Sequence, residues 1–182
     1  MTFVPLRTGE PLRPRSEDVP DVLLDCHLRM RQLTTLAAEL ASRPDATGDE
    51  VREVSGKVHR YFTVGLPLHE ADEETSLFPR LLKRAPELAG TIAALQEDHA
   101  AHAKRVGALV AVCLELKTRP EHAEALREEL AAAAQALADL WKLHLAVEES
   151  ELFPRVTTTL NDEDQAAIRE EMRARRAALP PR

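Results

Sequence analysis

The stretch that decides the fold occurs twice, as HEADEETSLFPR at residues 69–80 and as HLAVEESELFPR at residues 144–155. Both copies follow the pattern His-x-x-x-Glu-Glu-x-x-Leu-Phe-Pro-Arg. Residues four positions apart lie one turn apart on the same face of a helix. Each copy is therefore predicted to point one imidazole and one carboxylate in the same direction, from His69 with Glu73 and from His144 with Glu148.

The composition around these copies favours helices. The chain has 182 residues, of which 30% are charged and 3% aromatic, and it contains only six Gly. Ala, Leu, Glu and Arg dominate the sequence, and these residues are strong helix formers. The length suits one domain with a sizeable core. We therefore expect an all-α protein.

Apolar residues at three- and four-residue spacing predict four long helices, at about residues 21–42, 49–77, 86–117 and 121–149. Short connections between them indicate an up-down-up-down four-helix bundle. Gly65 and Pro67 predict a kink or a break in the second helix, since proline removes a backbone hydrogen bond. The Leu-Phe-Pro segments are interpreted as helix stops with an apolar plug over the end of the bundle.

Three regions follow from this pattern. Residues 1–20 form a predicted extended arm, because prolines at positions 5, 11, 14 and 20 prevent regular structure. Residues 21–156 form the predicted bundle. Residues 157–182 are predicted to hold an extra C-terminal helix, capped by Asn161, and a short tail.

The charge balance and the apolar pattern exclude several classes of protein. The net charge of −7 makes binding to nucleic acid or to an anionic membrane unfavourable. We expect no membrane span, because no apolar run approaches about 18 residues. The N-terminus lacks the apolar core of a secretory signal, so a cytoplasmic location is expected. Cys26 and Cys113 are interpreted as reduced packing residues.

Each predicted helix also carries an inward histidine. The first helix has His27 on its apolar stripe, and the third has His99 and His102 on or near its inner face. Imidazole and carboxylate together suit iron, manganese or zinc, and a carboxylate can bridge two metal ions. Buried glutamates without partners would be costly, so cations are expected opposite Glu73 and Glu148. The height of His99 in the bundle stays open.

The order of these residues resembles the hemerythrin-like, or HHE cation-binding, domain over about residues 21–156. The resemblance implies a four-helix bundle around a non-haem di-iron centre. It also implies that Glu73 and Glu148 bridge the irons and that four histidines are terminal ligands: His27, His69, His99 and His144.

The chain departs from the oxygen carriers of that family at two places. These proteins have a second histidine four residues after the first on the third helix, where this chain has Ala103. His102 shares a face with His99, and whether it is a ligand stays open. The carriers also use an aspartate five residues after the last histidine, whereas Glu148 stands four after His144. Reversible oxygen transport is therefore not the leading expectation.

Three functions follow from the sequence. The leading one is a di-iron protein that binds or reacts with a small molecule such as O2, NO or H2O2, with zinc or manganese as alternative metals. An enzymatic activity on peroxide or nitric oxide is left open. The second is an iron- or redox-sensing regulatory module that acts through a protein partner. The third is a metal-free structural or oligomerisation bundle, for example a homodimer.

Overall fold

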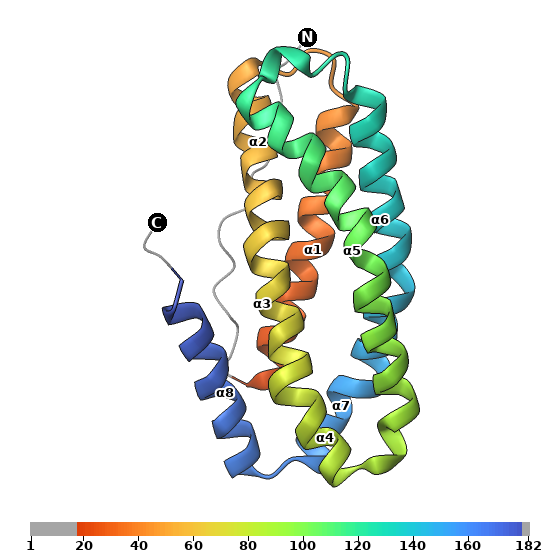
Figure 1. The fold of residues 1–182 in the computed structure, drawn as a ribbon, viewed down its shortest axis with the longest axis vertical. Coiled ribbons are helices and arrows are strands. Elements are labelled where there is room, and N and C mark those ends of the chain that lie inside the picture. The colour runs from red at the N-terminus through yellow and green to blue at the C-terminus, as the bar shows by residue number, and fades with distance from the viewer. Residues whose placement is uncertain (1–17, 180–182) are drawn as a thin grey trace.

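The computed structural model describes residues 18–179 and is helical almost throughout, with no strand in that range. Four helical rods run antiparallel to one another and form an elongated bundle (Figure 1). The predicted arm covers residues 1–20. Residues 1–17 lie outside the described part of the chain, and only the last three positions of the arm are described. The all-α fold and the four-helix bundle expected from the sequence are confirmed.

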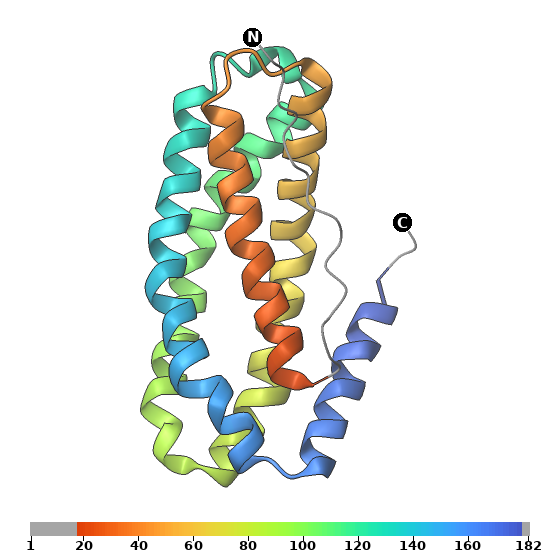
Figure 2. The same ribbon diagram turned by 180° about the vertical axis from the view of Figure 1, so that it is seen from behind.

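The four rods are built from the following elements. The first rod is α1 (Val19–Ala41), and the third is the 3-10 turn η3 (Pro86–Leu88) with α5 (Ala89–Thr118). The second is α2 (Gly48–Arg60), the π turn η1 (Tyr61–Gly65), α3 (Leu66–Ala71), the π turn η2 (Asp72–Leu77) and α4 (Phe78–Arg84). The fourth is α6 (Arg127–Val147), the π turn η5 (Glu148–Leu152) and α7 (Phe153–Thr159). Rods one and three each pack against rods two and four, as both views show (Figure 2).

The prolines inside rods two and four do not end their helices, and the predicted helix stops are wrong. Pro67, Pro79 and Pro154 each lie in the first turn of a new α segment that follows a π turn. Proline lacks an N–H group and its ring clashes with the carbonyl four residues earlier. A local widening to π geometry accommodates both defects, so the rods stay helical on either side. The expected kink or break near Pro67 takes this form.

Two helix starts also differ from the expectation. α1 begins at Val19, because Pro20 fits the first turn of a helix, where its missing N–H group costs nothing. The fourth rod begins its α-helix at Arg127, since residues Pro120–His122 form a separate 3-10 turn, η4. It then continues to Thr159, beyond the predicted end.

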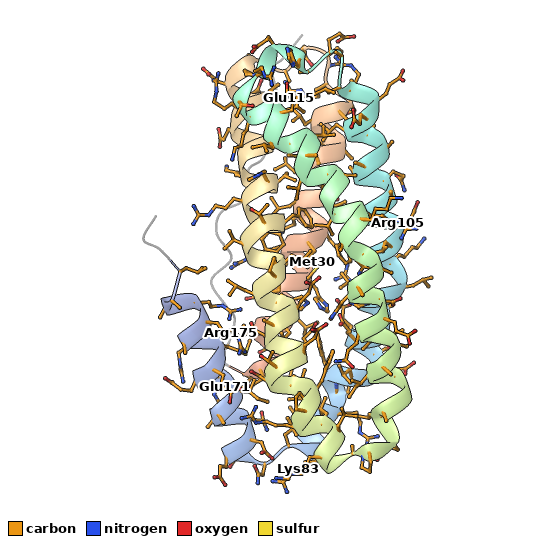
Figure 3. All side chains as sticks on the ribbon, viewed as in Figure 1. Met30, Lys83, Arg105, Glu115, Glu171 and Arg175 are labelled. Atoms are coloured by element: carbon orange, nitrogen blue, oxygen red, sulfur yellow. The ribbon has the colours of Figure 1, made fainter. Side chains whose placement is uncertain are left out.

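The fifth helix, α8 (Asp162–Ala177), packs against the outside of rod two. The side chain of Asn161 accepts a hydrogen bond from the backbone N–H of Asp164, which confirms the predicted cap. Figure 3 shows Arg175 and Glu171 on the side of α8 that faces the bundle. Arg80 of rod two donates two hydrogen bonds to Glu171, at 2.7 and 3.1 Å.

The apolar core of the bundle is divided in two. One cluster surrounds residues such as Met30 and Trp141, and the other surrounds residues such as Leu23 and Phe78. His27 lies between Leu23 and Met30 along α1, so the two clusters enclose a polar layer from both ends. The bundle thus holds polar side chains where water has little access.

None of the described helices is both long enough and apolar enough to cross a membrane.

Candidate metal centre

All of the residues predicted for the site are buried, with at most 8% of any one exposed. They come from all four rods and lie in or beside the polar layer: His27, His69, Glu73, His99, His102, His144 and Glu148. Their role as metal ligands stays a proposal. The structure answers the open question of height, because His99 Nε2 lies 3.1 Å from His144 Nε2.

One half of the layer is formed by His27, His69, Glu73 and Glu148. One ligand atom from each of these residues lies within 4.8 Å of the others. His27 Nε2 is 3.1 Å from Glu148 Oε2, and His69 Nε2 is 3.5 Å from Glu73 Oε2. This group offers two imidazole nitrogens and two carboxylates to one position.

The other half is formed by His99, His144 and Glu148, whose ligand atoms also lie within 4.8 Å of one another. His144 Nε2 is 3.2 Å from Glu148 Oε1, so Glu148 turns one oxygen toward each half. Glu73 Oε2 lies 3.6 Å from His99 Nε2 as well as 3.5 Å from His69. Both carboxylates therefore lie between two histidine pairs, as bridging ligands for two cations would.

Most of the donor atoms that face this space have no hydrogen-bond partner among the described residues, the exceptions being His99 Nε2 and His144 Nε2, which contact each other. The atoms without a partner are His27 Nε2, His69 Nε2 and both carboxyl oxygens of Glu73 and of Glu148. Several pairs approach within 4 Å, but not in hydrogen-bond geometry. Leaving so many buried polar atoms unsatisfied costs several kcal/mol. Metal ions would satisfy all of them at once, so the residues fit a metal centre.

The carboxyl groups of Glu73 and Glu148 have pKa values shifted in opposite directions. Burial, and then the neighbouring charge of Glu148, raises the pKa of Glu73 well above its usual value. Burial would also raise the pKa of Glu148, but its contacts with His144, His27 and His99 outweigh burial and hold that pKa well below its usual value. Burial, with His27 close by, lowers the pKa of His69, which keeps its imidazole neutral and able to ligate.

Three of the histidines are oriented from behind by carboxylates. His27 Nδ1 lies 2.8 Å from Glu149, His99 Nδ1 lies 2.9 Å from Glu74, and His144 Nδ1 lies 3.3 Å from Asp98. Such bonds leave Nε2 free for a metal, because they place the ring proton on Nδ1. His69 Nδ1 is the exception and has no partner among the described residues.

The phenylalanines of the repeated phrase pack against the same histidines. The ring of Phe153 lies 5.0 Å from that of His27, and the ring of Phe78 stacks over His99 at 6.3 Å. Each copy thus holds one histidine of another rod with a glutamate and a phenylalanine. The predicted apolar plug is therefore part of the wall of the polar layer.

The π turns place the central carboxylates, since Glu73 lies in η2 and Glu148 is the first residue of η5. α8 braces η2 from outside the bundle. Asp72, which is 1% exposed, accepts hydrogen bonds from Arg175 Nε at 2.8 Å and from Arg176 Nη2 at 2.6 Å. Arg175 also donates to Ser76 Oγ at 2.7 Å.

His102 takes a different place from the other histidines. It is grouped with Asp98 and His144, and not with Glu148. Its ring contacts those of Trp141 and His144, with centroids 5.2 and 4.7 Å away. Among residues 18–179, Glu70 belongs to none of the side-chain groups that could hold a metal ion.

Sequence reasoning missed Asp98 and the arginines of α8. Asp98 directly precedes His99, but adjacent residues on a helix point about 100° apart, so no spacing links Asp98 to His144. Asp72 and its partners Arg175 and Arg176 lie in different helices, and no local pattern connects them. The one available signal was Asp72 itself. It places an acidic residue at a position of the repeated phrase where the second copy has the apolar Val147, which marks a partner that only the first copy has.

Comparison with known proteins agrees with this geometry. Residues 18–156 match the family model described as hemerythrin HHE cation binding domain. A search of curated proteins finds no match to the chain. Because the matched residues cover well over half of the sequence, the chain belongs to the hemerythrin HHE cation-binding domain family.

Proposed function

We propose that the polar layer holds a pair of iron ions and that the protein binds or reacts with a small molecule such as O2, NO or H2O2. One observation carries the proposal: Glu148 offers one unpartnered oxygen to each of two histidine groups. A carboxylate in that position suits two cations better than one. Domains of this family bind metal ions, typically iron.

Iron would supply redox chemistry and an open coordination position. His27 and His69 would hold one ion, and His99 and His144 the other, with Glu73 and Glu148 between them. Mixed nitrogen and oxygen donors also suit manganese or zinc, so the metal is part of the proposal. The apolar clusters at both ends exclude water, which strengthens every charge interaction inside the layer.

The enclosed site supports a small ligand. Its donor residues are at most 8% exposed, and Leu77, Phe78, Leu152 and Phe153 close one end of the layer. An organic substrate would have to displace this packing, whereas a molecule of two to four atoms would not. Binding at such a site needs no large cleft.

Two measurements test the proposal. Elemental analysis of protein freshly purified from iron-rich medium should find about two irons per chain, as a di-iron centre requires. Anaerobic ferrous protein should then develop ligand-to-metal absorption bands on exposure to O2, H2O2 or NO. Glu148→Gln should lose most of the iron, whereas Glu151→Gln, which alters an exposed residue of the same π turn, should keep it.

Two results would contradict it. Less than about a tenth of an equivalent of any transition metal would favour a metal-free structural bundle. Spectra that stay featureless with iron bound would leave a metal site but remove the small-molecule chemistry.

A second candidate function is an iron- or redox-sensing module that a protein partner reads. The bracing of η2 by α8 favours it, because α8 lies beyond the matched residues 18–156 and contacts the turn that carries Glu73. In that case iron should change how firmly α8 is held. Limited proteolysis with and without iron tests this, and equal resistance of α8 in both states would exclude it.

A further inference from the structure

His102 is the one predicted ligand that the proposed pair of metal positions does not use. Its side chain is 3% exposed, and its Nδ1 has no hydrogen-bond partner within residues 18–179. One ligand atom of His102 lies within 4.8 Å of ligand atoms of Asp98 and His144. A buried imidazole that faces a carboxylate and a second imidazole calls for an explanation.

His144 connects this outer group to the inner one. Its Nε2 faces inward and lies 3.2 Å from Glu148 Oε1. Its Nδ1 faces Asp98 and lies 3.3 Å from Oδ2. The Asp98 side chain is 53% exposed, so solvent reaches this carboxylate, whereas Glu148 is fully buried. The three residues thus lead from the surface to the inner position.

We propose that Asp98, His102 and His144 form an outer site that takes up a divalent transition-metal ion and passes it to the inner group of His99, His144 and Glu148. The inference rests on the proposed function, because it concerns how that centre is filled. Two imidazoles and one carboxylate are a donor set that such ions favour.

The protons of His144 make the outer site a stage in loading and not a third permanent site. A neutral imidazole carries one proton, so it offers one nitrogen to a metal at a time. An ion on Nδ1 requires the proton on Nε2, which blocks the inner position. When the ion moves inward, Nε2 gives up its proton and Nδ1 gains one, which then bonds to Asp98. The net number of protons does not change.

The opposite half of the layer lacks this arrangement. On α5, Asp98 precedes His99 and His102 follows it by three residues; on α1, the matching neighbours of His27 are Cys26 and Met30. The first rod therefore offers no carboxylate or imidazole at these positions. The outer group is an addition to one half, where Trp141 and His144 hold the His102 ring in place.

Metal uptake by the metal-free full-length protein tests the proposal. Co2+ is the probe, because its visible absorption reports both the rate of binding and the final stoichiometry. We expect Asp98→Asn and His102→Gln each to slow uptake by about tenfold, with the final stoichiometry unchanged. Glu97→Gln is the matched control, since it removes the same charge from an exposed neighbour, and its uptake rate should stay within about twofold of the wild type.

His102→Gln is the more specific variant, because it leaves the Asp98–His144 hydrogen bond in place. Equal uptake rates in all four proteins would overturn the inference. So would the loss of one equivalent of Co2+ in His102→Gln, which would make His102 an inner ligand. A wild type that binds no Co2+ would instead contradict the proposed function itself.

Discussion

Glu149 of rod four accepts a hydrogen bond from His27 of rod one, with 2.8 Å between Oε1 and Nδ1. Glu74, at the same place in the first copy of the phrase, makes the same contact with His99 of rod three at 2.9 Å. Each copy therefore performs two tasks. It brings its own histidine and glutamate to the layer, and its second glutamate orients a histidine of another rod.

This relationship predicts the effect of Glu149→Gln. The amide keeps the size of the side chain but is a weaker acceptor for the Nδ1–H of His27, so the ring loses its fixed tautomer. We expect metal affinity to fall by about 10- to 100-fold, measured by competition with a chelator. Glu151→Gln, on the exposed face of the same π turn, should change affinity by less than about twofold. An equal loss in both variants would contradict a specific role for Glu149.

The sequence predicted the bundle and the inner faces well, because both depend on periodic patterns within one helix. His69 with Glu73 and His144 with Glu148 follow from i, i+4 spacing alone. The helix stops were wrong for a related reason. Pro79 and Pro154 each remove a backbone N–H group, so the sequence shows that a helical hydrogen bond is missing there. It does not show whether the helix ends at that point or widens into a π turn and continues.

The contacts between rods could not be predicted in the same way. Asp98 meets His144 and Asp72 meets Arg175 only because the bundle brings distant segments to one height. Local spacing holds no information on such pairs. The place of His102 likewise depends on Trp141 and His144, which belong to another rod.

Glu73 predicts how metal binding depends on pH. Burial and the charge of Glu148 raise its pKa well above the usual value, so in the metal-free protein this carboxyl group keeps its proton to a higher pH than an ordinary glutamate does. A proton-bearing Glu73 is favourable at low pH, and its contribution to stability is lost as pH rises through the raised pKa. If Glu73 is a metal ligand, as proposed, its carboxyl group must be ionised in the loaded protein, so metal binding should release this proton and metal affinity should rise with pH.

Calorimetry in two buffers with different ionisation enthalpies measures the released protons. Below the raised pKa of Glu73 we expect this residue to contribute about one proton per chain, because Glu148 is already ionised and His69 is already neutral. His99 adds its own proton where it is charged, since burial lowers its pKa but the contacts with Glu148 and Glu74 outweigh burial and raise it. Glu73→Gln should release about one proton fewer, and its residual metal affinity should vary less with pH. Heats that do not depend on the buffer would contradict this assignment.

Two glycines of rod two, Gly65 and Gly56, should respond in opposite ways to substitution by alanine. A Cβ added at Gly65 would meet the Tyr61 ring at 2.7 Å, and Tyr61 Oη donates a hydrogen bond to the Cys26 carbonyl at 2.9 Å. Gly65→Ala should therefore lower the free energy of unfolding by about 1–3 kcal/mol. At Gly56 no atom lies within 4 Å of an added Cβ, so Gly56→Ala should raise it by about 0.5–1 kcal/mol. Urea unfolding checks both signs, and a stabilised Gly65→Ala would show that the ring moves freely.

Asp72 predicts that α8 supports the metal centre. Its carboxylate is fully buried and is shared by Arg175 and Arg176, so Asp72→Asn leaves two guanidinium groups without their anion. We expect the free energy of unfolding to fall by about 3 kcal/mol. Because Asp72 directly precedes Glu73 in η2, the loaded variant should also lose metal to a chelator faster than the wild type.

Arg84→Gln provides the control for Asp72, because it removes a partly exposed ion pair with Asp164 at the other end of α8. That loss should cost less than about 1 kcal/mol and leave the rate of metal release unchanged. If both variants released metal at the same rate, α8 would stabilise the bundle in general and would not act through η2. Faster release from Asp72→Asn alone would place the effect at the turn that holds Glu73, since both variants weaken the docking of the same helix.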